Sequence, residues 1–334
     1  MTRLSSAILT PERWDTCDDR RMPHPAAAPL IVIGGPTATG KTALAIAIAE
    51  HLLARGLPAE IVSADSRQVY RGLDIGTAKA TPEERERVIH HGLDLVDADQ
   101  PYSVADFRPH ALSALEALGA RGGIGILAGG TGFWLRAVFA GIDTEALPSD
   151  EAIRSGLEAD LTRDGVDALA GRLAARAPRL AATTDLRNPR RVVRALEIAT
   201  LQGDAPLPRP VGYPAPVIGF QLRLEPSEHR RRIAVRARAQ FDAGLVEEAR
   251  TLRERFDPGL PAFSAIGYRE SWAVLDGELD LESAIELDAA RNVAFAKRQR
   301  TWFRREPSLQ VVDAADDPVR AAVDRLDAFV AGLG

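Results

Sequence analysis

Apolar residues form short blocks that alternate with helical patterns from Leu30 onward. Four apolar runs predict buried strands: Leu30–Ile33, Ala59–Ser63, His91–Val96 and Ile124–Ala128. Residues Thr42–Leu53 and about Val104–Leu118 instead repeat their apolar positions at helical spacing. Strands that alternate with helices are typical of a parallel sheet covered by helices on both faces.

The second half of the chain has a different pattern. From about Thr144 to Pro208 the sequence predicts short helices and carries no strand pattern. A strand-like run at Val217–Leu224 then resumes the sheet pattern. Two Arg-rich helices follow, at Ser227–Phe256 and about Leu281–Phe303, with an Ile-Gly-Tyr-Arg-Glu turn between them. A last strand at Leu309–Val312 and a terminal helix close the chain.

These patterns divide the chain into three parts. Residues 1–28 show neither helical nor strand periodicity and are predicted to be a disordered extension. Residues 29–143 and 209–334 form an α/β core with the Arg-rich C-terminal helices. Residues 144–208 form a helical insertion, whose two ends we expect to lie close together on the core.

Composition narrows the class of protein. No stretch approaches the roughly 20 apolar residues of a membrane span, and the segment before Pro29 lacks the apolar core of a secretory signal. The single cysteine, Cys17, excludes an internal disulfide. We therefore expect a cytoplasmic protein with no membrane partner, and we take a monomer as the starting expectation.

The basic residues are distributed unusually for a chain of net charge −5. Of 42 basic residues only Lys41, Lys79 and Lys297 are lysines, and the rest are arginines. A lysine that survives such a bias marks a position where a compact ammonium is needed, unless its survival is chance. All three lysines lie in motif-like segments, which favours the functional interpretation.

The strongest motif is a phosphate-binding loop, or P-loop. Residues 35–42 fit GxxxxGK[ST] between a strand and a helix, as the motif requires. The loop amides and the helix N-terminus would hold phosphate, Lys41 would reach the terminal phosphate, and the Thr42 hydroxyl would hold Mg²⁺. The run Ile124–Ala128 has no acidic residue at its end, so the chain lacks the carboxylate that helps a nucleotide hydrolase to hold magnesium. The predicted diphosphate-binding residues are Gly35, Pro36, Thr37, Ala38, Thr39, Gly40, Lys41 and Thr42.

Three further residues have two interpretations each. Asp65 follows the second strand, where it would face the P-loop crevice and act as a general base, or would cap a following helix. Thr131, in the Gly-Gly-Thr-Gly turn that follows Ile124–Ala128, would contact the ligand or simply form a tight turn. Lys79 is either functional or an ordinary solvated lysine.

Three basic clusters suggest a polyanionic partner. The second contains Arg232 and Arg236, which are four residues apart and share a helix face. The third includes Phe295, Trp302 and Phe303, which would stack on bases or belong to the core. The clusters are Arg187, Arg190, Arg191 and Arg194; Arg230, Arg231, Arg232, Arg236 and Arg238; and Lys297, Arg298, Arg300, Arg304 and Arg305.

Six segments together resemble the tRNA dimethylallyltransferase family, which prenylates the adenine 3′-adjacent to the anticodon. They are GPTATGKT, ADSRQVYRGLDIGTAK, GGTGFW, NPRRVVRALEI, AIGYRE and AKRQRTWFR, in this order over residues 31–305. The joint set is specific, whereas the P-loop alone is shared by many unrelated proteins. Thr39, Ala80 and Phe133-Trp134 depart mildly from the usual family residues.

The resemblance implies a P-loop NTPase-like core that holds the diphosphate of dimethylallyl diphosphate. It implies that Asp65 is the base for the adenine amine and that Thr131 and Arg236 contact the reacting groups. It also implies tRNA contacts over the anticodon stem-loop, with the helical insertion gripping it. The tRNA-binding residues so implied are Asp65, Ser66, Arg67, Gln68, Arg154, Arg190, Arg191, Arg194, Ser264, Gly267, Tyr268, Arg269, Lys297, Arg298 and Gln299.

Three other functions stay open from the sequence. A P-loop kinase would bind ATP and have no use for RNA-sized basic clusters. A prenyltransferase acting on free adenine nucleotides would not need the C-terminal cluster of basic and aromatic residues. An RNA-binding module without catalysis would leave Lys41 and Asp65 without a task.

Overall fold

The computed structural model describes residues 27–142 and 147–333, so the predicted extension lies outside the described residues except for its last two positions. The chain divides into two compact units. One unit comprises residues 1–141 and 212–334, and the other comprises residues 142–211. Residues 143–146, where the insertion was predicted to begin, also lie outside the described residues.

The first unit contains a six-stranded sheet in the order β3-β2-β4-β1-β5-β6, and every pair of neighbours is parallel. The predicted parallel α/β architecture is therefore confirmed. The strands are β1 (Leu30–Gly34), β2 (Ala59–Ser63), β3 (His90–His91), β4 (Ile124–Gly129), β5 (Val217–Arg223) and β6 (Gln310–Asp313).

The strand predicted at His91–Val96 is largely wrong. Only His90–His91 pairs with the sheet, as β3. The chain then turns through Gly92 (φ +80°) and Asp94 (φ +54°), conformations that end an extended run. A Cβ at Gly92 would lie 2.7 Å from the Ser63 carbonyl oxygen, so the turn packs directly against β2.

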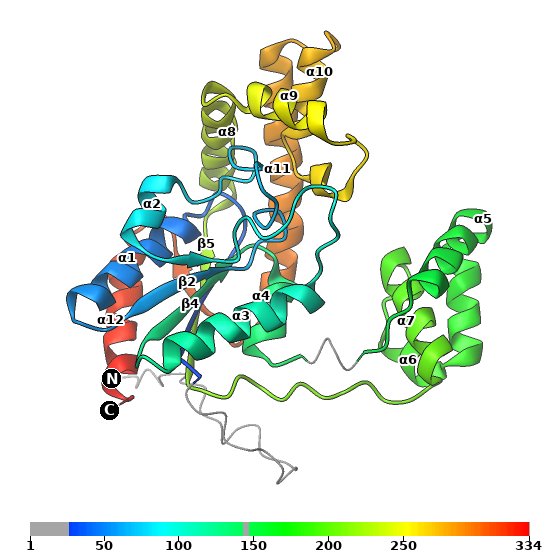
Figure 1. Ribbon diagram of the computed structural model, residues 1–334, viewed down its shortest axis with the longest axis horizontal. Helices are drawn as coiled ribbons and strands as arrows, with labels where there is room; N and C mark the ends of the chain where they lie inside the picture. The colour runs from blue at the N-terminus through cyan, green and yellow to red at the C-terminus, as the bar shows by residue number, and fades with distance from the viewer. Residues whose placement is uncertain (1–26, 143–146, 334) are drawn as a thin grey trace. The chain divides into compact units, whose positions relative to one another are not determined.

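The strands are apolar at nearly every position, so both faces of the sheet must be buried. Helices cover both faces. On β1, Ile31 and Ile33 pack with α1 (Lys41–Ala54) and α12 (Pro318–Ala331). The alternate residues of β1 pack with the other side, which holds α3 (Val104–Gly119) and α4 (Gly132–Phe139). Figure 1 shows α1 beside α12 on one side of the sheet and α3 with α4 on the other.

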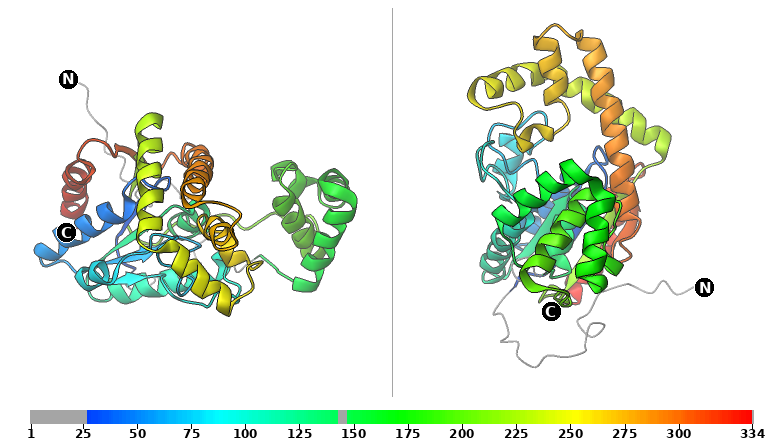
Figure 2. Two further views of the ribbon diagram at one scale, coloured as in Figure 1. Left: turned by 90° about the horizontal axis from the view of Figure 1, so that it is seen from above. Right: turned by 90° about the vertical axis from the view of Figure 1, so that its right-hand side faces the viewer.

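The single helix predicted at Ser227–Phe256 is wrong. The segment forms α8 (Pro226–Asp242) and α9 (Leu245–Arg255), separated at Gly244, whose φ of +100° favours glycine and ends a helix. A short 3₁₀ helix (Pro261–Ser264) and α10 (Tyr268–Leu275) follow, so the predicted turn is in part a helix. The long α11 (Leu281–Phe303) matches its prediction and packs beside α8 (Figure 2).

The second unit has helices and no strand among its described residues. It contains α5 (Glu151–Arg176), α6 (Pro178–Thr183) and α7 (Pro189–Gln202), packed around an apolar cluster of their own. α5 is longer than the predicted short helices, although its backbone breaks at Gly165 (φ +81°). In residues 27–142 and 147–333, no helix is long and apolar enough to cross a membrane.

Candidate active site

The loop between β1 and α1 has the backbone shape of an anion-binding site. Gly35 (φ +151°), Ala38 (φ +58°) and Gly40 (φ +87°) all have positive φ. A Cβ at Gly35 would lie 2.8 Å from the Leu222 carbonyl oxygen on β5, so only glycine fits there. Because α1 begins at Lys41, its free N–H groups and positive dipole end face the loop.

Two buried side chains hold the middle of this loop. Gln299 accepts a hydrogen bond from the Thr37 amide (2.8 Å), and its NH₂ group donates to the Gly130 carbonyl after β4 (3.0 Å). His229 bonds the Thr37 carbonyl through Nε2 (2.8 Å), so Nε2 must carry the proton. Its Nδ1 can then accept from Arg300 (3.3 Å). These contacts fix the P-loop without using a ligand.

Two cations enter the crevice at the P-loop. Lys41 donates to the Pro36 carbonyl (2.8 Å), and Arg236 from α8 donates to the Thr37 hydroxyl (2.9 Å). Burial, helped by repulsion from Arg236 and opposed by Asp65, lowers the pKa of Lys41 to about 8. Burial also lowers the pKa of Arg236, although a guanidinium keeps its proton. Two cations so placed favour an anionic ligand.

Asp65 and Thr131 meet at the carboxyl ends of β2 and β4. The Thr131 hydroxyl accepts a hydrogen bond from the Ser66 amide (3.1 Å), which ties the two strand ends together. Asp65 accepts from the Arg67 amide through Oδ1 (2.9 Å). It caps a turn and not a helix, because α2 (Pro82–Arg87) begins only later. The structure thus brings Asp65, Thr131, Lys41 and Arg236 to one edge of the sheet, as sequence reasoning expected.

Lys79 is not a solvated lysine. Its side chain is 1% exposed and forms ion pairs with Asp74 and Asp94, both at 2.6 Å. Its ammonium also donates to the Tyr70 carbonyl (2.8 Å). Three acceptors suit the three protons of an ammonium, which explains why arginine does not stand here. Lys79 therefore organises the loop after Asp65.

Two residues expected at the tRNA interface point inward. The Gln68 amide donates to the carbonyls of Thr77 and Ala78, both at 3.1 Å. Tyr268 is fully buried, and its hydroxyl donates to Glu248 (2.8 Å). Burial and the nearby Glu248 raise the pKa of Tyr268 well above its usual range. Both side chains support the loop of residues 76–78 from within, since Tyr268 packs directly on Gly76.

Other expected tRNA contacts remain on the surface. Arg269 on α10 is exposed, as is Ser264, whose hydroxyl donates to the Pro261 carbonyl (2.8 Å). The preceding Gly267 (φ +110°) is buried. On α11, Lys297 and Arg298 are exposed, whereas the next residue is the inward Gln299 described above.

The aromatic residues of the third cluster differ in exposure. Phe303 is 1% exposed and belongs to the core. Trp302 packs on Gly132, with the Arg136 guanidinium 5.0 Å from its ring centroid. Phe295 is 36% exposed, and the Arg298 guanidinium lies 5.6 Å from its ring centroid. Only Phe295 of the three is available to stack on a base.

The second cluster is not a continuous basic face. Apart from the inward Arg236, its members are partly neutralised by acidic neighbours. Arg231 and Arg232 both bond Glu228, at 2.7 and 2.8 Å. Arg238 pairs with Glu282. Arg230 is exposed.

In the second unit, two of the expected tRNA-binding arginines share one buried carboxylate. Arg154 and Arg194 bond Glu197 at 3.0 and 2.7 Å, and Glu197 is fully buried. Burial raises the pKa of Glu197, but hydrogen bonds from Arg194 and Arg154 outweigh it and hold the pKa below its usual value. Arg190 and Arg191 are exposed at the start of α7.

Sequence reasoning missed His229 and the bridging role of Gln299. Gln299 lies in a motif that pointed to the surface, and only the packing of α11 turns it toward the P-loop. His229 carries no sequence signal, because a histidine among arginines reads as part of a basic helix face.

Family models match the chain over most of its length. The model described as IPP transferase matches residues 68–306, and the model described as isopentenyl transferase matches residues 28–93. A tRNA dimethylallyltransferase of Bordetella petrii is 42% identical, over 92% of this chain and 99% of the relative. Another, of an Anaeromyxobacter species (strain K), is 47% identical, over 83% of this chain and 90% of the relative.

Solved structures of the same kind are similar. A tRNA isopentenylpyrophosphate transferase of Bacillus halodurans matches with a TM-score of 0.66 and 36% identity, covering 91% of this chain and 96% of that one. A eukaryotic dimethylallyltransferase described as acting on tRNA matches with a TM-score of 0.70 and 26% identity, covering 86% and 74%.

Proposed function

This chain belongs to the IPP transferase family, and on that premise we propose that it prenylates tRNA. It transfers a dimethylallyl group from dimethylallyl diphosphate to the exocyclic amine of the adenine 3′-adjacent to the anticodon, and it releases diphosphate. The observation that carries the proposal is the meeting of a P-loop, two partly buried cations and a strand-end carboxylate at one sheet edge. A tRNA substrate implies action in the cytoplasm.

The diphosphate is held where negative charge develops. As the bond from the allylic carbon to diphosphate breaks, charge accumulates on the leaving oxygen atoms. Lys41, the loop amides and Arg236 already surround that position, so they stabilise the transition state more than the ground state. Because Gln299 and His229 fix the loop, its amides need little reorganisation.

Thr42 fits the role of a magnesium ligand. It is the second residue of α1, is partly exposed, and offers a hydroxyl beside Lys41. A Mg²⁺ ion held there would neutralise charge on the diphosphate oxygens when bound.

Asp65 removes the proton from the attacking amine. The adenine amine is a poor nucleophile because its lone pair is delocalised into the ring, and it must lose a proton as it attacks. Oδ1 of Asp65 is fixed by the Arg67 amide, while Oδ2 accepts no hydrogen bond from the described residues. The Thr131 hydroxyl, bound to the Ser66 amide, lies beside this carboxylate and orients the incoming groups.

Exposed cations on each of the two units hold the tRNA. From the core these are Arg269, Lys297 and Arg298, and from the insertion they are Arg190 and Arg191. Drawing the target adenine out of its stack costs a few kcal/mol, which such phosphate contacts offset. Arg154 and Arg194 reach the tRNA from the positions that Glu197 gives them.

A transfer assay with three acceptors tests the proposal. The protein is incubated with dimethylallyl diphosphate and Mg²⁺, together with tRNA, AMP or ATP, and each acceptor is examined by mass spectrometry. We expect the mass of one dimethylallyl group on tRNA alone. Prenylation of AMP or ATP with unmodified tRNA would contradict the proposal, and phosphate transfer from ATP would indicate a kinase.

A further inference from the structure

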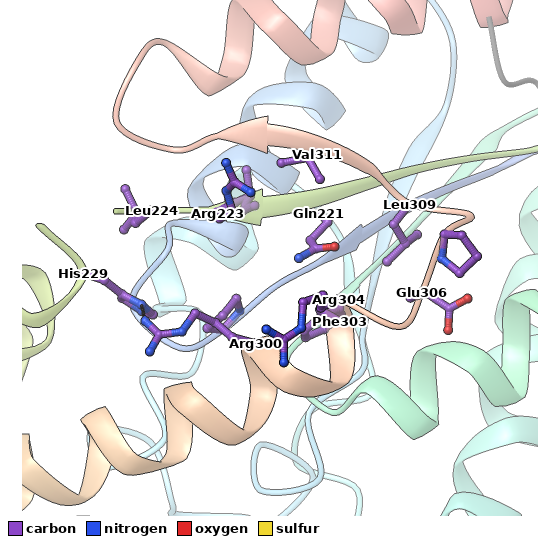
Figure 3. Close-up of a pocket in the computed structure, with 13 residues that line it drawn as sticks. Gln221, Arg223, Leu224, His229, Arg300, Phe303, Arg304, Glu306, Leu309 and Val311 are labelled. Atoms are coloured by element: carbon purple, nitrogen blue, oxygen red, sulfur yellow. Dashed lines mark hydrogen bonds between the residues drawn. The ribbon is translucent and has the colours of Figure 1, made fainter. Parts of the chain in front are cut away.

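A cavity of about 390 Å³ lies beside the P-loop, between the C-terminal end of α11 and strands β5 and β6 (Figure 3). Pro36 of the P-loop forms part of its wall. Its lining is apolar at Leu222, Phe303 and Leu309. Three arginines also line it: Arg223 of β5, Arg300 of α11, and Arg304, the residue that follows α11.

The arginines give this cavity a positive charge that the protein does not neutralise. Within residues 27–142 and 147–333, none of the three forms an ion pair with a carboxylate. The one carboxylate in the lining, Glu306, is already bound by Arg136 (2.8 Å) and by the Ser308 hydroxyl (3.0 Å). Cations gathered around a cavity repel one another, so their arrangement favours an anionic ligand.

The cavity is also connected to the P-loop through side chains. Arg300 donates to Nδ1 of His229 (3.3 Å), and Nε2 of the same ring bonds the Thr37 carbonyl (2.8 Å). An anion that draws Arg300 toward it therefore pulls on the group that fixes the P-loop. The cavity shares Pro36 with the P-loop, but its lining does not include the other residues of the candidate active site: Lys41, Asp65, Thr131 and Arg236.

We propose that this cavity is a second binding site for a small organic diphosphate, in addition to the P-loop site. The arginines would take the diphosphate and the apolar lining would take a short hydrocarbon group. A volume of about 390 Å³ is in the range of small-ligand pockets. The choice of ligand rests on the proposed function, because that reaction consumes such a compound at the neighbouring P-loop.

Calorimetric titration of the full chain with dimethylallyl diphosphate, with Mg²⁺ and without tRNA, tests the proposal. We expect two binding sites on the wild-type protein. Lys41→Ala should lose the P-loop site and keep the other. Arg223→Gln/Arg304→Gln should weaken the cavity site by about tenfold or more for each arginine and keep the P-loop site. Arg305→Gln, an exposed neighbour outside the cavity, is the matched control and should keep both sites.

A single binding site on the wild-type protein would overturn the proposal, as would two unchanged sites in the double variant. Loss of both sites in a double variant with wild-type melting temperature would show that the arginines only support the P-loop. Arg304→Gln alone repeats the test if the double variant unfolds. Inorganic diphosphate should bind the cavity more weakly, and equal affinity would refute the apolar part of the site.

The transfer assay on the same samples separates this inference from the proposed function. Prenylated tRNA with one-site binding would remove the second site and leave the function standing. Two-site binding without prenylation would keep the second site and contradict the proposed function.

Discussion

Gln299 on α11 accepts a hydrogen bond from the amide of Thr37, which lies 262 residues earlier in the chain (2.8 Å). The same side chain donates to the Gly130 carbonyl in the turn that precedes Thr131 (3.0 Å). One side chain thus sets the separation between the loop that holds the diphosphate and the turn that faces the nucleophile. Since both backbone groups are buried, their hydrogen bonds matter for stability as well as for geometry.

Gln299→Leu should therefore destabilise the protein and slow transfer. It leaves two buried backbone groups without partners, at about 1–3 kcal/mol each. Urea unfolding measures the loss, and donor titration measures the weakened P-loop. The exposed neighbour Arg298→Gln is the control and should unfold like the wild type within about 0.5 kcal/mol. Wild-type stability in the leucine variant would show that the two hydrogen bonds of Gln299 do not contribute to the free energy of unfolding.

Lys41 should make donor binding depend on pH in the alkaline range. Its pKa is lowered to about 8 in the free protein, and a bound diphosphate raises it by attraction. Affinity is then fully present below about pH 8 and falls as pH rises above it, with uptake of a proton on binding. Calorimetry in buffers of different ionisation enthalpy measures that uptake. Lys41→Arg stays charged, so it should lose this pH dependence; an unchanged profile would assign the titration to another group.

Arg190 and Arg191 should contribute to tRNA affinity without affecting stability. Both are exposed at the start of α7, so Arg190→Gln/Arg191→Gln removes charge and little packing. We expect weaker tRNA binding and a salt dependence that is flatter by about one unit per lost phosphate contact. Binding of dimethylallyl diphosphate should not change. A tRNA affinity and a salt slope equal to wild type would show that these residues are merely solvated.

Glu197 should act through the arginines it holds. Glu197→Ala leaves Arg154 and Arg194 without their shared carboxylate, and because both arginines are about one third exposed we expect thermal unfolding to show a loss of about 1–3 kcal/mol. Because the pKa of Glu197 is lowered on folding, its contribution is present above the unfolded pKa and is lost as pH falls through the folded one. Glu151→Gln, which removes an 82% exposed partner of Arg154, is the control.

The parts of the site that depend on local sequence were predictable. The P-loop could be predicted because its strand, glycine-rich loop and helix are consecutive in the sequence. Asp65 could be placed beside the P-loop because parallel strands end at the same edge of a sheet. The role of Arg236 came from the family resemblance, and its spacing from Arg232 located it. Each of these inferences needed only a few neighbouring residues.

The parts that depend on packing were not predictable. Lys79 is an ion-pair centre only because a turn places Asp94 beside it, and Gln299 faces the P-loop only because of how α11 packs. The helix break at Gly244 was not predicted because Ala, Arg and Glu continue on both sides of it at helical spacing. In sequence Arg194 resembled its exposed neighbours, but it forms an ion pair with the buried Glu197 one turn later.

The central claim is that Asp65 accepts the proton as a dimethylallyl group passes from the P-loop to tRNA. A single-turnover experiment with saturating protein, dimethylallyl diphosphate and tRNA, followed by digestion and mass spectrometry, tests it most directly. Asp65→Asn keeps an oxygen for the Arg67 amide but cannot take a proton. We predict that the wild type prenylates one adenine, immediately 3′ of the anticodon, and that the variant binds both substrates but reacts roughly 10²–10⁴-fold more slowly. Equal rates in the two proteins, or a modified base elsewhere in the tRNA, would contradict the account.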